Sequence, residues 1–117
     1  MEITLTIDGK EIPFKSTGAA VKRYMAQFQR DLLKDIMKMG VANIDFDNMT
    51  EEQAIEWMRD HIDFNMFYDV AWVYAKTANP AIPEPFTWLD SFDEFPILDV
   101  IEPLQELLIK TIGSKKK

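Results

Sequence analysis

The first fifteen residues alternate between polar and apolar side chains in the pattern of a β-hairpin. Over 2–7 the apolar positions are Ile3, Leu5 and Ile7, which is the period of two of a half-buried strand. Asp8-Gly9 follows, a dipeptide suited to the positive φ angles of a tight hairpin turn. We therefore predict a hairpin over 2–15 with one shared apolar face, in which the facing pairs are Ile7 with Lys10, Leu5 with Ile12, and Ile3 with Phe14.

A single apolar stripe then extends from position 21 to position 39. Its members recur at spacings of three and four residues, as on one face of an amphipathic helix, and they are Val21, Tyr24, Met25, Phe28, Leu32, Ile36 and Met39. Ser16 or Thr17 can cap the helix at its start, and Gly40 is placed to end it. The pattern predicts one helix over 17–39 with a mostly basic opposite face.

The apolar pattern changes after an acidic loop at 41–49. Thr50 and Gln53 have the spacing of a capping box, which predicts the start of a helix. Beyond Asp63 the apolar residues occupy every side of the helix, which is typical of a helix at the centre of a core. The segment 50–77 is either one long helix or two, and in the second case Asp60 or Asp63 caps the second half.

Prolines organise the segment that follows. Three of them fall between 78 and 85, and they exclude regular structure there because proline cannot donate a backbone hydrogen bond. Thr87 and Asp90 can cap a short helix that extends through Phe95.

The last apolar stripe predicts a C-terminal helix. Pro96 suits its first turn, Pro103 should kink or restart it, and Gly113 ends it. Together these patterns predict a mainly α (α+β) fold, in which an N-terminal β-hairpin packs on a bundle of about four helices. We expect a single globular domain over 1–113, with the hairpin at 2–15 and the helices over 17–113, followed by a flexible basic tail at 114–117.

Charge is distributed unevenly along the chain. The formal net charge is -7, but residues 17–40 hold five basic and two acidic side chains, whereas 41–110 hold fifteen acidic and three basic ones. A basic helix in an acidic body indicates either pairing between neighbouring elements or two oppositely charged docking faces. The acidic total argues against nucleic acid as a partner, because phosphate contacts need an excess of Lys and Arg.

Other features of the composition bear on location. The chain contains no cysteine, which excludes disulfides and thiolate chemistry and fits a reducing cytosol. No apolar stretch approaches the roughly 18 residues of a membrane span. The N-terminus lacks the basic and then apolar regions of a signal peptide. We therefore expect a protein without membrane contact that stays in the cytoplasm where it is made.

Residues suited to catalysis or metal binding are few. His61 is the only histidine and points away from Asp60 on a helix, so we interpret it as a surface residue. Residues 45–56 match a calcium loop at positions one, three and twelve, but Met49 and Thr50 stand where an oxygen ligand and a glycine are needed. Because nucleophile, glycine-rich and paired-carboxylate motifs are missing, the sequence predicts no enzyme, no cofactor and no metal.

Two other features have ordinary explanations. We interpret the pair Glu102 and Glu106 as an exposed helix face. The chain also contains seven Met, three Trp, three Tyr and eight Phe residues, most of which we expect in the core. Methionine is, however, also found on adaptable surfaces that receive apolar partners.

Several short strings resemble tail assembly chaperones of long-tailed phages and prophages of Gram-positive bacteria. Those similar to the opening of this family are Ile12-Pro13-Phe14-Lys15, Gly18-Ala19, Arg23-Tyr24, Gln27-Phe28, Arg30-Asp31 and Lys34-Asp35. Those similar to its middle and C-terminal parts are Phe67-Tyr68, Ala71-Trp72, Ala75 to Ala78, Pro80, Ile82-Pro83, Trp88-Leu89-Asp90 and Phe92 to Pro96. The resemblance spans nearly the whole chain.

The resemblance implies a small, mostly helical protein without chemistry of its own that acts in the cytoplasm of the bacterial host. Such chaperones coat the tape measure protein, recruit tail tube subunits and leave before the virion is finished. Members of the family often have a longer form made by ribosomal slippage. The codons of Lys115 to Lys117 would permit slippage if they form an adenine run, although a plain basic tail is equally economical.

We expect a partner to contact the basic helix together with a flanking aromatic residue. The candidates are Lys22, Arg23, Arg30, Lys34, Trp72 and Trp88. The expected partners are the tape measure and tail tube proteins, and the chain itself can form a homo-oligomer. The alternative is an acidic helical inhibitor or immunity-type protein that masks a basic target, which the acidic 41–110 segment favours.

Overall fold

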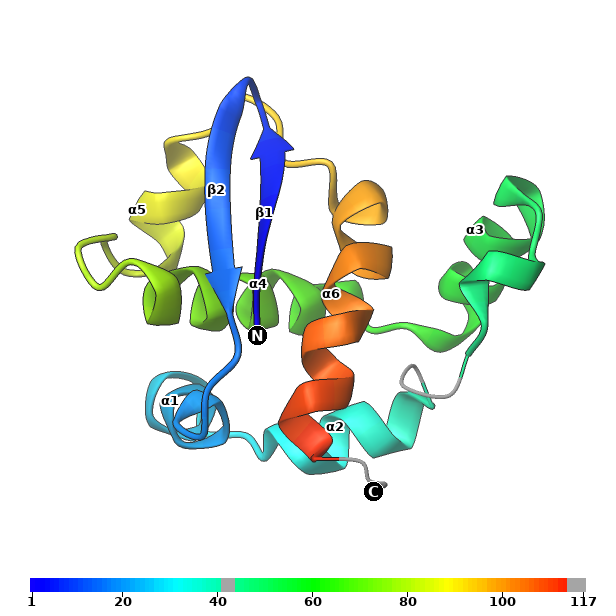
Figure 1. The fold of residues 1–117 in the computed structure, drawn as a ribbon, viewed down its shortest axis with the longest axis horizontal. Coiled ribbons are helices and arrows are strands. Elements are labelled where there is room, and N and C mark those ends of the chain that lie inside the picture. The colour runs from blue at the N-terminus through cyan, green and yellow to red at the C-terminus, as the bar shows by residue number, and fades with distance from the viewer. Residues whose placement is uncertain (41–43, 114–117) are drawn as a thin grey trace.

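The computed structural model describes residues 1–40 and 44–113. In chain order, the elements are β1 (Glu2–Ile7), β2 (Lys10–Lys15), α1 (Ala20–Phe28), α2 (Leu32–Met39), the 3₁₀ turn η2 (Phe46–Asn48), α3 (Glu51–His61), α4 (Phe64–Ala78), α5 (Pro85–Asp90) and α6 (Ile97–Ile112). The mainly α fold with an N-terminal hairpin is confirmed (Figure 1). Among these residues no helix is long and apolar enough to cross a membrane. The predicted basic tail lies outside the described residues.

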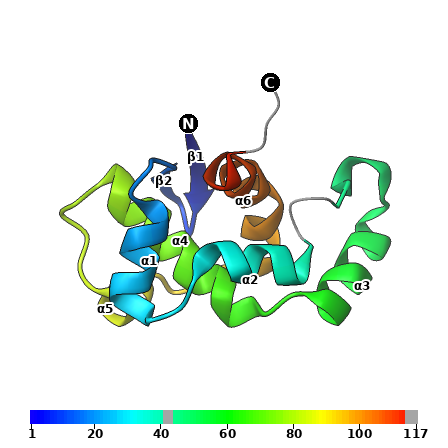
Figure 2. The same cartoon turned by 90° about the horizontal axis from the view of Figure 1, so that it is seen from below.

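The hairpin has the predicted turn and register. Leu5 faces Ile12, and the turn residues Asp8 and Gly9 take φ angles of 56° and 74°. Ile7 and Phe14 are buried because β2 packs against α4, across which the hairpin runs (Figures 1 and 2). The shared apolar face therefore rests on a helix, as a two-stranded sheet requires for stability in water.

Helix α4 is the centre of the core. Its buried residues lie on several sides of the helix, and they are Met66, Phe67, Val70, Ala71, Trp72, Val73, Tyr74 and Ala75. They contact the hairpin, α1, α5 and α6. Asp63 caps the start of α4 by accepting from the backbone N–H groups of Asn65 and Met66, so 50–77 forms two helices.

The prediction of one helix over 17–39 is wrong, because the chain turns between α1 and α2. Gln29 ends α1 with a left-handed φ of 57°, and Asp31 caps α2 by accepting from the backbone N–H of Lys34. The apolar stripe continues across the turn because both helices bury it in the same core. Neither Ser16 nor Thr17 is the N-cap of α1, since that position is Ala19.

The remaining helix boundaries agree with the sequence in part. The capping box of Thr50 and Gln53 starts α3 as predicted. The predicted caps of the next short helix are wrong. Glu84 caps α5, because its carboxylate accepts from the backbone N–H of Thr87. Pro85 occupies the first helical position, where the N–H that proline lacks has no partner within the helix. Helix α5 also ends at Asp90, before Phe95.

Helix α6 runs through its proline and packs on α4. Pro96 stands at the N-cap, Pro103 lies inside the helix without restarting it, and Gly113 ends it with a φ of 73°. The Tyr74 hydroxyl from α4 donates to the carbonyl of Leu107 at 3.3 Å. This bond ties the centre of the core to the last helix.

Candidate protein-interaction site

Two of the residues predicted to contact a partner are core residues. Trp72 and Trp88 each expose 4% of their surface. The indole N–H of Trp72 donates to the carbonyl of Pro83 at 2.9 Å, and Trp88 packs edge to face on Phe92 and Phe95. Both side chains therefore stabilise the fold, and in this structure neither is presented to a partner.

A third predicted contact residue, Arg30, belongs to a partly exposed polar cluster that joins three elements of the fold. Its guanidinium donates to Asp69 on α4 and, at 2.8 Å, to the hydroxyl of Tyr24, which in turn donates to Asp35 at 3.0 Å. Burial raises the pKa of Asp69 above its usual range, and Arg30 opposes that shift. Burial, followed by the hydrogen bond to Asp35, also raises the pKa of Tyr24. Arg30 thus joins the α1–α2 turn to α4.

The other three basic residues lie on two separate helices. Lys22 is exposed and Arg23 half-buried on α1, whereas Lys34 is exposed on α2. Two large apolar side chains are exposed on the same helices, Met25 at 45% and Met37 at 65%. Their contact with a partner stays a prediction, and the turn at 29–31 divides the expected continuous face.

A groove between α3 and α6 is one of several depressions formed by the described residues. Helix α3 lies at one end of the molecule, beyond α6, in both Figure 1 and Figure 2. The groove between these helices has a volume of about 750 Å³. Residues from α3, α6 and the segment that precedes α3 line it.

The apolar part of the lining, here called the apolar floor, exposes less surface than the polar part. The apolar lining residues are Phe46, Met49, Ala54, Ile55, Met58, Leu98 and Pro103. Ile55 on α3 and Leu98 on α6 are 42% and 41% exposed, although both are large aliphatic side chains. Phe46 is held in place by an edge-to-face contact with Trp57, with ring centroids 5.9 Å apart. The groove therefore offers apolar surface that the chain itself leaves uncovered.

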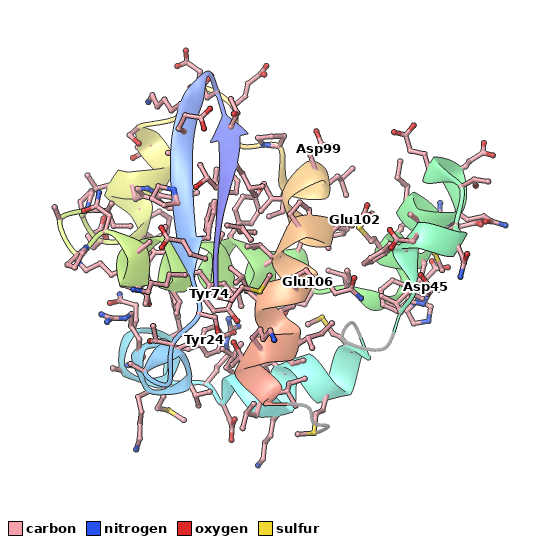
Figure 3. The ribbon with its side chains drawn as sticks, viewed as in Figure 1. Tyr24, Asp45, Tyr74, Asp99, Glu102 and Glu106 are labelled. Atoms are coloured by element: carbon pink, nitrogen blue, oxygen red, sulfur yellow. The ribbon has the colours of Figure 1, made fainter. Side chains whose placement is uncertain are left out.

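Carboxylates form both rims of the groove. Asp99, Glu102 and Glu106 follow α6 along one rim, and Figure 3 labels all three. Asp47 and Glu51 lie on the opposite rim. No basic side chain of the described residues lines the groove, and none of these five carboxylates forms an ion pair with a residue in 1–40 or 44–113. The rims are consequently a source of uncompensated negative charge.

Pro103 adds a polar acceptor to the same groove. In an α-helix the N–H of residue 103 would bond to the carbonyl of Asp99, but proline has no N–H. The Asp99 carbonyl therefore lacks its usual helical donor, one turn from Pro103 in the lining.

A hydrogen bond joins α6 to the segment that leads into α3. The side-chain amide of Gln105 on α6 donates to the backbone carbonyl of Ile44 at 2.6 Å. Ile44 directly precedes the segment that leads through η2 into α3. The bond thus anchors the start of one wall to the other wall.

The structure also places the residues considered for metal binding. His61 is exposed and stacks on Trp57 with ring centroids 4.6 Å apart, while its Nδ1 lies 2.9 Å from the Trp57 carbonyl. In the described part of the chain, no group of three or more His, Asp or Glu side chains is placed to hold a metal ion. Thr50, within the calcium-like string, serves as the cap of α3.

Sequence reasoning missed the groove, although part of its pattern is visible. Positions 99, 102 and 106 repeat at helical spacing, which puts three acids on one face of α6, and Leu98 and Pro103 adjoin them. The facing wall could not be predicted because α3 is placed by tertiary packing. Comparison with protein-family models, with curated proteins and with solved structures finds no match to this chain.

Proposed function

We propose that this protein is a non-catalytic assembly chaperone that holds a helical segment of another protein in the α3–α6 groove. The observation that carries the proposal is an open groove lined by carboxylates, in which the aliphatic side chains of Ile55 and Leu98 are exposed. A surface of this kind binds an amphipathic segment that would otherwise aggregate. The groove needs no reacting group for that task.

The resemblance to tail assembly chaperones of long-tailed phages supports a particular partner. On this proposal the bound segment belongs to the tape measure protein, and the chaperone helps to recruit tail tube subunits in the cytoplasm of the bacterial host. A long helical partner presents many similar apolar stripes. Met49, which lines the groove and is half-buried, suits such variety because its flexible side chain adapts to different shapes.

Co-expression with the candidate tape measure protein tests the proposal. We expect the tape measure protein to be soluble with the wild-type chain and insoluble without it. Ile55→Ser should weaken this effect because it removes an exposed apolar contact from the groove. Met37→Ser is the control, since it removes an apolar side chain that is more exposed, at 65%, and that does not line the groove. A tape measure protein that stays insoluble with the wild-type chain would refute the chaperone role.

A second candidate function is an inhibitor or immunity-type protein that masks a basic target. The five carboxylates of the groove favour it, because they have no ion pair within 1–40 or 44–113 and complement a positively charged surface. Such a protein would form a stoichiometric complex with one basic enzyme and suppress its activity. It would not keep a tape measure protein in solution, so the same co-expression experiment separates the two functions.

A further inference from the structure

We infer that the α3–α6 groove selects a basic amphipathic α-helix, with an apolar stripe flanked on both sides by Lys or Arg. The inference rests on the proposed function and specifies the chemistry of the partner at that site. It follows from the charge of the rims, from the backbone of the walls and from the spacing of the acids on α6.

The charge of the rims sets the sign of the partner. Carboxylates lie on both sides of the apolar floor, with Asp99, Glu102 and Glu106 on α6 and Asp47 and Glu51 across from them. An acidic helix placed in this groove would face like charges on both flanks. A helix with basic residues on both flanks would pair with them and gain association rate as well as specificity.

The backbone of the walls sets the secondary structure of the partner. Most of the lining residues lie on the helices α3 and α6, the others belong to the segment 46–50 that precedes α3, and none of them lies on a strand. The groove therefore offers no sheet edge to which an extended peptide could add. A segment that enters its apolar floor must satisfy its own backbone hydrogen bonds, and a helix does so.

The spacing of the acids on α6 determines how long a partner helix must be to contact all of them. Positions 99 and 106 are seven residues apart, which corresponds to about two helical turns, or roughly 10 Å along α6. A partner helix of two to three turns can therefore place basic residues three or four positions apart beside Glu102 and Glu106.

A designed peptide provides a direct probe. We would use a fluorescein-labelled peptide of about 18 residues with Leu at spacings of three and four and Lys on both flanks, and measure binding by fluorescence anisotropy. We expect saturable binding that weakens as salt is raised. An otherwise identical peptide with Glu in place of Lys should not bind. Equal binding of the two peptides would overturn the inference.

Two variants of the chain separate groove charge from overall charge. Glu102→Gln with Glu106→Gln removes two rim carboxylates, whereas Glu52→Gln with Glu56→Gln removes two carboxylates of the same spacing on α3 that do not line the groove. We expect affinity for the Lys peptide to fall about three- to tenfold in the first variant and less than about twofold in the second. Equal losses in both would show a general charge effect and overturn the inference.

The failure of this inference can be distinguished from the failure of the proposed function. If the wild-type chain and the Glu102/Glu106 variant keep the tape measure protein equally soluble, the chaperone role stands and the basic-helix specificity is wrong. Analytical ultracentrifugation adds one further outcome. If the wild-type chain is an oligomer and the Glu102/Glu106 variant is a monomer, a second copy of the chain occupies the groove and the inference is overturned.

Discussion

The hydroxyl of Tyr24 on α1 donates a hydrogen bond of 3.0 Å to the carboxylate of Asp35 on α2. The bond spans the turn at which the chain leaves one helix and enters the next. The same hydroxyl accepts from Arg30, which lies within that turn. Through Arg30 the pair is linked to Asp69 on α4, so one polar cluster holds two helices and the turn against the centre of the core.

Replacement of this hydroxyl should weaken the fold without a change in its shape. Tyr24→Phe keeps the buried ring but deprives Asp35 of a donor and Arg30 of an acceptor. Because the bonds involve charged groups, we expect the free energy of unfolding to fall by about 1–3 kcal/mol. Urea denaturation followed by circular dichroism measures this loss.

Tyr68→Phe is the matched control for the same deletion. Tyr68 is half-buried on α4, packs on Phe95, and its hydroxyl has no hydrogen bond with the described residues. We expect its free energy of unfolding to change by less than about 0.5 kcal/mol. Equal losses for the two variants would show that the Tyr24 cluster contributes nothing specific.

The elements predicted from the sequence were those specified by neighbouring residues. The hairpin register depends on Asp8-Gly9 and on alternation within a few positions, and the start of α3 depends on Thr50 and Gln53. The break between α1 and α2 could not be predicted, because the apolar spacing continues through it. Its cause includes Asp69, which lies far along the chain from Arg30 and approaches it only in the folded protein.

The candidate site was harder to predict than the fold. A tryptophan beside basic residues is compatible with a partner surface, but Trp88 is on the buried side of α5. Whether an aromatic residue is covered depends on the packing of segments far apart in sequence. The acids of α6 were visible as a helical face, and only the position of α3 makes that face one wall of a groove.

The start of α5 should confer a pH dependence on stability. The carboxylate of Glu84 accepts from the hydroxyl and then from the backbone N–H of Thr87, and these bonds lower its pKa from the ordinary value of 4.5. Because the folded-state pKa is the lower one, the stabilising contribution is present above 4.5 and is lost as the pH falls through the lowered value. Glu84→Gln should therefore be less stable than wild type at neutral pH, and the difference should shrink on acidification.

Urea denaturation of both proteins from neutral pH to about pH 3 tests this expectation. Glu94→Gln is the control, because Glu94 is exposed and has no hydrogen bond with the described residues. It should change the free energy of unfolding at neutral pH by less than about 0.5 kcal/mol. A constant difference between Glu84→Gln and wild type across the whole range would contradict the capping role.

The two aromatic residues of α5 should respond in opposite ways to truncation. Trp88 exposes 4% of its surface and Phe86 exposes 79%. Trp88→Ala leaves a cavity beside Phe92 and Phe95 and should lower the free energy of unfolding by about 3–5 kcal/mol. Phe86→Ala should change it by less than about 0.5 kcal/mol. Thermal or urea denaturation measures both changes. A small loss of stability for Trp88→Ala would contradict the placement of this residue in the core.

Pro103 should make α6 less stable than it would be with alanine at this position. Pro103→Ala supplies the missing N–H to the Asp99 carbonyl and relieves the clash of the ring with the preceding turn. This change alone would raise the free energy of unfolding by up to about 3 kcal/mol. The lost ring contacts and the greater entropy of the unfolded chain offset part of that gain, so we expect a net stabilisation of about 1–2 kcal/mol.

Pro96→Ala is the control for the proline substitution, because Pro96 stands at the N-cap, where no helical bond is missing. There the unfolded chain gains freedom without compensation, and we expect a loss of about 0.4–1 kcal/mol. Opposite signs for the two variants in urea denaturation would show that Pro103 is tolerated at a cost to stability.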